Sequence, residues 1–314
     1  MKRVLITPKS FHICKEQAYA RLRERGYEPI ENRTGRTLTE AEIVDLAREG
    51  VVGVIVGVDP MPARVLNQLR DVKAISKYGM GTDNIDLERA LQLGIRVRTA
   101  AATNHVSVAE LTLGLLLACA RHIPAVAANV KRGGWDRVLG RELAGKKLGL
   151  VGGGQIGREV AKRARALEME VSVHDPYLRD ETFFHQHGIR LCPRLDDLLR
   201  ESDYVSLHLP ATPETRHLIN ERTLSLMKPT AMLINTSRGE LVDEDALYDA
   251  LTGGRLAGAA QDVFSAEPPL PGTKLTALDS FILTSHIGAY TYEAIEKMAL
   301  QSTSNLLEML EEDG

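Results

Sequence analysis

The chain has 314 residues, of which 44% are hydrophobic and 26% are charged, and its formal net charge is −3. This length and composition are typical of a globular protein with about two domains. The charge balance excludes the strongly basic surface of a nucleic-acid-binding protein, and the locally basic stretch 121–147 is expected to be a solvated face or a subunit contact.

The cysteines and the apolar runs of the chain indicate its cellular location. The three cysteines are odd in number and widely spaced, which fits neither a disulfide framework nor a metal-ligand pattern, so we predict a reducing, cytoplasmic location and no bound metal. The apolar run near the N-terminus is too short for a signal peptide. The most apolar segment, Leu111–Ala120, is about half as long as a membrane span, which predicts a buried helix and no membrane partner.

Short apolar runs alternate with amphipathic runs from the first residues onward. The runs at 3–8, 52–58 and 72–76 are typical of strands that are covered on both faces. Thr39 followed three residues later by Glu42 predicts a capping box at the start of a helix. This alternation predicts a parallel sheet with helices on both sides.

A long apolar helix is predicted over about 105–121, and a second series of strands follows it. Six strand candidates with helical runs between them fit a doubly wound nucleotide-binding fold. Their ranges are 146–152, 170–175, 204–209, 231–236, 256–263 and 281–286. The last helix, about 290–311, carries an apolar stripe and has no strand after it, so it is expected to pack back on the first unit.

These patterns predict an α/β protein with two doubly wound parallel-sheet domains, the first of them discontinuous. The first domain is expected to comprise 1–99 and 288–314, and the second, a Rossmann nucleotide-binding domain, 100–287. The first domain has no glycine fingerprint, so nucleotide binding is assigned to the second.

The stretch GLVGGGQIGREVA at 149–161 joins a predicted strand to a predicted helix through the spacing G-x-G-x-x-G, formed by Gly152, Gly154 and Gly157. The first glycine permits a tight turn, the second lets the backbone approach a pyrophosphate, and the third lets helix and strand pack closely. Asp175 lies 18 residues after Gly157, where a carboxylate accepts hydrogen bonds from ribose hydroxyls and repels a 2′-phosphate. The pattern predicts bound NAD.

Two alternatives to this assignment stay open. The glycines could form a structural turn, with Asp175 as a surface residue before Pro176. Arg179 is near enough to the same strand end to leave NADP as a second cofactor.

Hydride transfer from a hydroxy acid needs a base for the hydroxyl proton, a cation for the carboxylate and a group that tunes the base. Arg238, Glu267 and His286 each lie at or after the end of a different predicted strand. Because ligands bind outside the carboxyl ends of the strands in an open α/β sheet, we expect these side chains to meet at one edge. Each residue alone could instead be a structural turn, loop or core residue. For all three to be structural, three independent coincidences would be needed.

Motifs along nearly the whole chain carry a resemblance to a known family. In chain order they are YGMGTDNIDL, NHVSVAELTLGLLLACAR, GLVGGGQIGREVAKRA, HLPATPETRHLIN, NTSRGELVDEDAL, DVFSAEPP and SHIGA. In this order and spacing the chain resembles the D-isomer-specific 2-hydroxyacid dehydrogenases, most closely the phosphoglycerate-dehydrogenase-like branch. The resemblance implies an NAD-dependent enzyme that transfers a hydride between nicotinamide and a D-2-hydroxy acid or 2-oxo acid, with 3-phosphoglycerate as one candidate.

The resemblance also implies roles for single residues. Arg238 is expected to bind the substrate carboxylate and carbonyl oxygen, and His286 to be the acid/base. Glu267 is expected to accept a hydrogen bond from the other ring nitrogen of His286, which fixes the tautomer and raises the pKa of the imidazole. Further residues are expected to line the cofactor, namely Gln155, Ile156, Asp175, Thr212, Thr236 and Asp262.

For the first domain, the resemblance implies a flavodoxin-like substrate domain that acts as a lid, with catalysis in the cleft between the two domains. The backbone at Tyr78 and Gly79 is expected to hold the substrate carboxylate, with Lys77 as a cation beside it. Family members usually pair through the segment that spans about 100–145 here, so a homodimer is expected.

One departure from the family bears on the substrate. Well-studied phosphoglycerate dehydrogenases carry arginines for the substrate phosphate, whereas this chain has Gly57 and Asp59 at one matching place, and a carboxylate repels a phosphate. Glyoxylate, hydroxypyruvate or another small 2-oxo acid therefore stays open. A nucleotide-sensing co-regulator or binding protein of the same fold is the other alternative, although the intact Arg238, Glu267 and His286 favour an enzyme.

Overall fold

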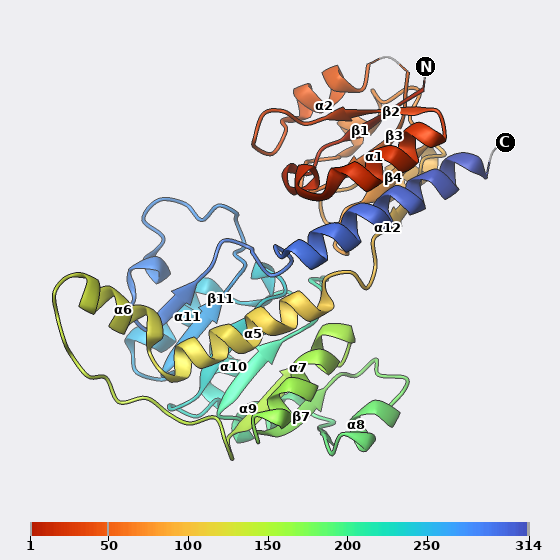
Figure 1. Ribbon diagram of the computed structural model, residues 1–314. Helices are drawn as coiled ribbons and strands as arrows, with labels where there is room; N and C mark the ends of the chain where they lie inside the picture. Colours follow the sequence, from red (N-terminus) through yellow and green to blue (C-terminus); the bar gives the residue numbers. More distant parts are fainter. Residues whose placement is uncertain (1, 49, 313–314) are drawn as a thin grey trace. The chain divides into compact units, whose positions relative to one another are not determined.

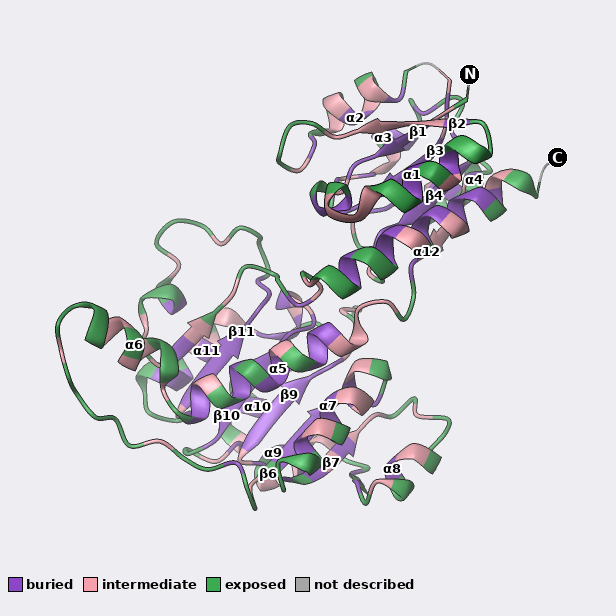
Figure 2. Ribbon diagram, in the orientation of Figure 1, coloured by how far each residue is buried: buried purple, intermediate pink, exposed green. Residues whose placement is uncertain are grey.

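The computed structural model describes residues 2–48 and 50–312 (Figure 1). They divide into two compact units, one made of His105–Gly288 and the other of the described residues before and after it. Each unit contains one parallel sheet covered by helices, so the predicted fold class, α/β with two doubly wound parallel sheets, is confirmed. Figure 2 shows that most strands of both sheets are buried, which places the cores along the sheet faces.

The first unit contains a five-stranded parallel sheet in the order β2-β1-β3-β4-β5, which is the flavodoxin-like order. Separate hydrophobic clusters lie on its two faces. The strands are β1 (Lys2–Ile6), β2 (Tyr27–Glu31), β3 (Val51–Val56), β4 (Ala74–Lys77) and β5 (Arg96–Thr99). The helices between them are η1 (Lys9–Cys14), α1 (Lys15–Glu24), α2 (Glu40–Leu46), α3 (Ala63–Leu66) and α4 (Leu87–Gln92).

Helix α2 begins at the predicted capping box. The hydroxyl of Thr39 accepts the N–H of Glu42 at 3.4 Å, and the carboxylate of Glu42 accepts the N–H of Thr39 at 2.8 Å. Two N–H groups that a helix start leaves unpaired are satisfied in this way. This local prediction is confirmed.

The last helix, α12 (Tyr292–Glu311), returns to the first unit and packs against β3, β4 and β5. Gly53 in β3 permits the close approach, because a Cβ atom there would lie 3.0 Å from a methyl group of Leu306. At the exposed edge, Arg98 of β5 pairs with Glu308 at 3.0 Å. The final helix thus completes the core of the first unit from the far end of the chain.

The second unit contains a seven-stranded parallel sheet in the order β12-β11-β10-β9-β6-β7-β8. This is the dinucleotide-binding order with one more strand at the β12 edge. The strands are β6 (Lys147–Val151), β7 (Glu170–His174), β8 (Arg190–Leu191), β9 (Tyr204–Leu207), β10 (Met232–Asn235), β11 (Gly258–Gln261) and β12 (Phe281–Leu283). The helices are α5 (His105–Ala120), α6 (Ile123–Lys131), α7 (Gln155–Ala166), α8 (Thr182–Gln186), α9 (Leu195–Glu201), α10 (Glu221–Leu226), η2 (Gly239–Leu241), α11 (Glu244–Thr252) and η3 (Lys274–Ala277).

Helix α5 carries the most apolar segment of the chain and is largely buried in the second unit. Leu113, Leu116 and Ala120 are all buried and belong to the core beside α7. Within the described residues, no single helix has both the length and the apolar composition of a membrane span. The pair α5 and α6, bent by 65°, meets both criteria only when the two helices are taken together.

Candidate active site

The predicted site residues of the second unit follow the carboxyl ends of its parallel strands. The glycine loop follows β6, and Asp175 follows β7. Arg238 follows β10, Glu267 follows β11, and His286 follows β12. Because the strands are parallel, these ends share one edge of the sheet, and the chain order reverses there between β6 and β9. Such a switch point is where open α/β sheets bind ligands.

The glycine loop has the backbone geometry that a dinucleotide requires. Gly152 has a φ of +104°, and a Cβ atom there would lie 2.2 Å from the carbonyl oxygen of His208. A Cβ atom on Gly157 would lie 2.3 Å from the carbonyl oxygen of Gly152, so α7 and the loop are in direct backbone contact. At Gly154, by contrast, no described atom outside the adjacent backbone lies within 4 Å of the Cβ position. A pyrophosphate can therefore approach the start of α7, where unpaired N–H groups favour an anion.

Asp175 lies beside this loop. Its Oδ2 accepts the N–H of Gly153 at 2.9 Å, and its Oδ1 accepts the N–H of Tyr177 at 2.9 Å. These backbone donors fix the carboxylate at the position where the ribose of a dinucleotide lies in this fold. The cradle at Gly154 and the placement of Asp175 both fit NAD.

The other residues predicted to line the cofactor lie in the same unit. Gln155 and Ile156 form the first turn of α7, directly after the glycine loop. Thr236 is buried just after β10, where its hydroxyl pairs with that of Thr112 at 2.9 Å. Thr212 is half-buried in the loop after β9. All four are placed at or next to the carboxyl ends of strands.

His286 and Glu267 form a direct hydrogen-bonded pair. Nδ1 of His286 lies 2.6 Å from Oε2 of Glu267, and the other carboxylate oxygen accepts the N–H of Phe264 at 3.0 Å. The hydrogen bond to Glu267 raises the pKa of His286, although partial burial opposes it. Partial burial acts to raise the pKa of Glu267, but the bond and charge of His286 outweigh it and lower that pKa. The pairing holds the Nδ1 proton and leaves Nε2 for proton transfer.

Asp262 holds the turn that carries His286. Its side chain is buried, and its two carboxylate oxygens accept the N–H groups of Ile287 at 2.9 Å and Gly288 at 2.8 Å. Its backbone carbonyl accepts the N–H of His286 at 2.8 Å. These bonds stabilise His286 in a left-handed conformation, with a φ of 53°. The sequence indicated Asp262 only as a cofactor residue, because an aspartate after a strand carries no signal of this anchoring role.

A tight turn after β10 presents Arg238. The side-chain oxygen of Asn235 accepts the N–H of Ser237 at 3.0 Å, and its side-chain amide donates to the carbonyl of Arg238 at 2.8 Å. Gly239 then passes so close to the next loop that a Cβ atom on it would lie 1.9 Å from the carbonyl carbon of Phe264. The segment that carries Arg238 and the loop that carries the acidic partner are therefore in backbone contact.

Arg238, Glu267 and His286 are brought together by these contacts. The hydrogen bond to Glu267 is the largest influence on the pKa of His286 and raises it. The positive charge of Arg238 opposes this rise. For Glu267, burial acts to raise the pKa and the hydrogen bond from His286 acts to lower it. The positive charge of Arg238 adds to this lowering. A guanidinium, a carboxylate and an imidazole thus share one electrostatic environment at the carboxyl edge of the second sheet.

In the first unit, the predicted substrate residues follow β4. Gly79 has a φ of +117°, a backbone conformation that favours glycine. The side chain of Tyr78 is buried, with its hydroxyl 3.3 Å from the hydroxyl of Ser10 and 3.3 Å from the carbonyl oxygen of Ile295. Burial raises the pKa of Tyr78 to about 12. The aromatic ring therefore belongs to the core, and the backbone is the part of Tyr78 open to a ligand role.

Two charged side chains of the first unit are hydrogen-bonded within that unit. Lys77 is buried, and its ammonium donates to the carbonyl oxygen of Gly57. Asp59 is also buried, and its carboxylate accepts the N–H of Leu38 at 2.7 Å and the hydroxyl of Thr7. Both charges are bound by groups of their own unit. The role of Lys77 toward the substrate and the repulsion of a phosphate by Asp59 stay predictions.

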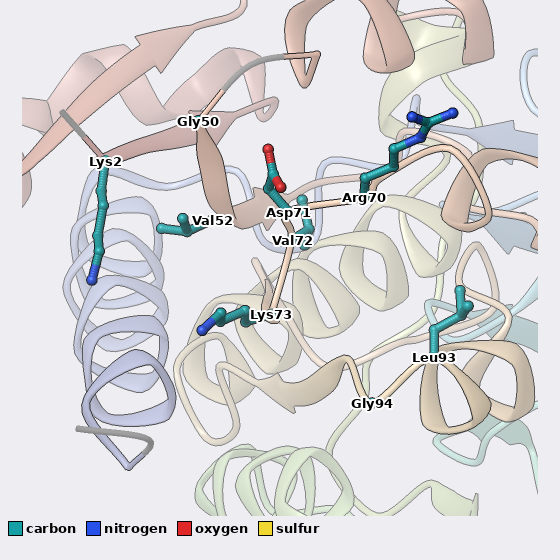
Figure 3. A pocket seen from close by; sticks show the side chains of 9 residues that line it. All are labelled: Lys2, Gly50, Val52, Arg70, Asp71, Val72, Lys73, Leu93 and Gly94. Atoms are coloured by element: carbon teal, nitrogen blue, oxygen red, sulfur yellow. The ribbon is translucent and has the colours of Figure 1, made fainter.

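A surface cavity of about 460 Å³ lies at the opposite edge of the first sheet (Figure 3). It is lined by Lys2, Gly50, Val52, Arg70, Asp71, Val72, Lys73, Leu93 and Gly94. These residues lie at the amino ends of strands, whereas ligands of such sheets bind at the carboxyl ends. In Figure 3 the side chain of Arg70 points away from those of Lys2 and Lys73. Among the described residues, no group of three or more His, Cys, Asp or Glu is placed to hold a metal.

Comparison with known proteins matches the second unit to one family. Residues 113–288 fit the family described as D-isomer specific 2-hydroxyacid dehydrogenase, NAD binding domain. A D-3-phosphoglycerate dehydrogenase of Methanocaldococcus jannaschii is 41% identical over 296 residues, which cover 94% of this chain and 55% of that protein. The chain therefore spans about half the length of this relative.

Two further proteins are similar over almost their full lengths. A hydroxypyruvate reductase of Thermotoga maritima is 38% identical over 281 residues, which cover 88% of this chain and 90% of that protein. The crystal structure of the TT0316 protein from Thermus thermophilus has a TM-score of 0.88 and 40% sequence identity, and the match covers 99% of this chain and 97% of that one.

Proposed function

The chain belongs to the D-isomer-specific 2-hydroxyacid dehydrogenase family, and from this premise we propose that it is an NAD-dependent oxidoreductase of D-2-hydroxy acids. The observation that carries the proposal is the hydrogen-bonded pair of His286 and Glu267, which lies beside Arg238 on the sheet edge that also bears the glycine loop. A nucleotide-sensing protein would need the glycine loop but not this pair.

The proposed reaction follows from the chemistry of these three groups. The glycine loop at Gly154 and the carboxylate of Asp175 would hold NADH, which would supply the hydride for C2 of the 2-oxo acid. The guanidinium of Arg238 binds the substrate carboxylate and polarises the carbonyl oxygen. As the C2–O double bond opens, His286 gives its Nε2 proton to the oxygen, and Glu267 stabilises the imidazolium beforehand through Nδ1. In the oxidation direction, neutral His286 takes the hydroxyl proton back.

For the substrate we propose a small 2-oxo acid without a phosphate group, such as hydroxypyruvate or glyoxylate. The burial of Lys77 against the carbonyl of Gly57 supports this choice, because the ammonium is engaged within its own unit rather than presented to a substrate phosphate. The backbone of Tyr78 and Gly79 is proposed to contact the substrate carboxylate. 3-Phosphoglycerate, the alternative, would need a different cation.

The test is NADH oxidation with hydroxypyruvate, glyoxylate, pyruvate and 3-phosphohydroxypyruvate. We expect the highest kcat/KM with an unphosphorylated substrate, and a preference for NADH over NADPH of roughly tenfold or more, because Asp175 repels the 2′-phosphate. A preference for 3-phosphohydroxypyruvate would contradict the substrate proposal. No oxidation with any 2-oxo acid would contradict the enzyme itself.

The substitution Glu267→Gln is expected to shift the pH dependence of reduction. Reduction needs the imidazolium, so activity is present below the pKa of His286 and falls as the pH rises through it. Because the hydrogen bond to Glu267 raises that pKa, a neutral partner lowers it, and the basic limb of the kcat/KM profile moves to lower pH. An unshifted limb, measured over the full pH range, would leave Glu267 as an ordinary loop residue.

We propose that the chain forms a homodimer through the segment that includes α6 and the residues after it. This segment exposes large apolar side chains, among them Trp135 at 79% and Leu139 at 94% of their surface. Apolar side chains exposed in one contiguous segment mark an interaction surface.

The double substitution of Trp135 and Leu139 to Ser is expected to convert the dimer to a monomer, which light scattering coupled to gel filtration measures. Removing two apolar side chains that the proposed interface would bury weakens a dimer by roughly a hundredfold or more. Leu91→Ser is the matched control, because Leu91 is 80% exposed in α4. A double variant that remains dimeric would exclude this surface as the interface.

The proposed location is a reducing compartment such as the cytoplasm. All three cysteines, Cys14, Cys119 and Cys192, are free, which is typical of proteins kept reduced.

A further inference from the structure

The loop that carries Glu267 is held by the segment that follows β10. Gly239 is in backbone contact with Phe264, where a Cβ atom would lie 1.9 Å from the carbonyl carbon. A second contact is polar, since Oε1 of Glu244 accepts the N–H of Ser265 at 2.8 Å. The loop is thus fixed at two consecutive residues, just before Glu267.

Secondary structure sets the position of Glu244. It is the first residue of α11, and Asp243 caps this helix by accepting the N–H of Ala246 at 3.1 Å. The next residue, Asp245, lies in the same helical turn and is exposed. Glu244 is partly buried and bonded to the loop, so two neighbouring acidic residues of one turn differ in their surroundings.

We propose that Glu244 is a positioning residue for the acid/base pair, an inference that rests on the proposed dehydrogenase function. Its carboxylate fixes the backbone at Ser265, and the adjacent N–H of Phe264 is thereby aimed at Oε1 of Glu267. Glu267, held in this way, keeps its Oε2 at 2.6 Å from Nδ1 of His286. The contacts connect α11 to the imidazole, although among the described residues Glu244 is hydrogen-bonded to neither the imidazole nor its carboxylate partner.

Three charged groups act on His286, namely Glu267, Asp262 and Arg238. The two carboxylates favour the imidazolium, Glu267 most strongly, and the guanidinium disfavours it. Glu267 is the group carried by the loop that Glu244 holds. Loss of the Glu244 contact is therefore expected to weaken the largest of these effects and to leave the other two in place.

The test compares Glu244→Ala, Glu244→Gln and the control Asp245→Ala in the full chain. Glu244→Ala is expected to reduce kcat/KM for the 2-oxo acid by about tenfold or more, because the pair is displaced from its productive geometry. The basic limb of the pH profile is expected to move to lower pH by roughly half a unit or more. Glu244→Gln keeps an acceptor oxygen for Ser265 and is expected to recover the pH profile, and Asp245→Ala is expected to match the wild type.

Titration of His286 by NMR of the histidine side chains separates this inference from the proposed function. The signal is assigned by its loss in His286→Asn. A lower His286 pKa in Glu244→Ala but not in Glu244→Gln supports the positioning role even if the wild type oxidises no NADH, a result that would overturn only the dehydrogenase proposal. An unchanged His286 pKa in Glu244→Ala overturns the positioning role. A His286 pKa that is lowered equally in Glu244→Ala and Glu244→Gln also overturns it. If Glu244→Ala is unstable, Glu244→Met gives the same test with the side-chain length kept.

Discussion

The variant His286→Asn is expected to lose about a thousandfold in kcat for reduction of the 2-oxo acid, because asparagine cannot donate a proton to the forming alkoxide. Asparagine is the substitution of choice, since His286 has a φ of 53° and asparagine tolerates this left-handed conformation better than most residues. The affinity for NADH is expected to change little, because the glycine loop and Asp175 follow other strands. Steady-state turnover and a fluorescence titration of NADH measure the two effects separately.

A second histidine–glutamate pair gives the control for this prediction. Nε2 of His185 in α8 lies 3.3 Å from Oε2 of Glu181, the residue before that helix, and both side chains are more than half exposed. His185→Asn removes the same chemical group from an exposed pair and is expected to leave turnover unchanged. Near-normal turnover in His286→Asn, with a normal His185→Asn enzyme, would assign the proton transfer to another group.

The strands that could be predicted from sequence are the buried ones. β3 reads VVGVIV and β10 reads MLIN, and such apolar runs are typical of parallel strands covered on both faces. β2 was not predicted, because it reads YEPIE, with Pro29 at its centre and only Tyr27 buried. A proline is tolerated there because β2 is an edge strand that pairs with β1 alone. β8 has two residues, too few for a periodic pattern.

In the candidate site, too, some features can be predicted from a local sequence pattern and others cannot. The glycine loop is predictable because its spacing expresses a local steric need, which the near contact of Gly157 with the carbonyl of Gly152 illustrates. The direction of a charged side chain depends instead on hydrogen-bond donors and acceptors far away in sequence. Lys77 meets the carbonyl of Gly57, and Asp59 meets an N–H group 21 residues before it, so neither orientation is visible in the pattern.

Contacts between segments that follow different strands are the part of the site that is hardest to predict from sequence. The bond from Ser265 to Glu244 joins the loop after β11 to the start of α11, and Asp262 anchors a turn beyond the next strand. Only parallel pairing of β10, β11 and β12 brings these segments together. Topology therefore had to be known before the supports of the acid/base pair could be identified.

Arg238→Ala is expected to reduce kcat/KM by between about a hundredfold and a thousandfold. The guanidinium is proposed to bind the substrate carboxylate in the ground state and the polarised oxygen in the transition state, so KM rises while kcat falls. Arg238→Lys keeps a positive charge but replaces a planar fork of donors with a single ammonium, so it is expected to recover only part of the loss. Steady-state kinetics of both variants check the expectation.

The pH profile tests whether Arg238 stands beside His286 or acts only on the substrate. The hydrogen bond to Glu267 is the main influence that raises the pKa of His286, and the charge of Arg238 opposes it. Arg238→Ala removes that opposition, so the basic limb of reduction is expected to move to higher pH, opposite to the shift in Glu267→Gln. Arg238→Lys keeps the charge and is expected to leave the limb in place. Normal turnover in Arg238→Ala, or a shift in the same direction as Glu267→Gln, would place the guanidinium outside the catalytic group.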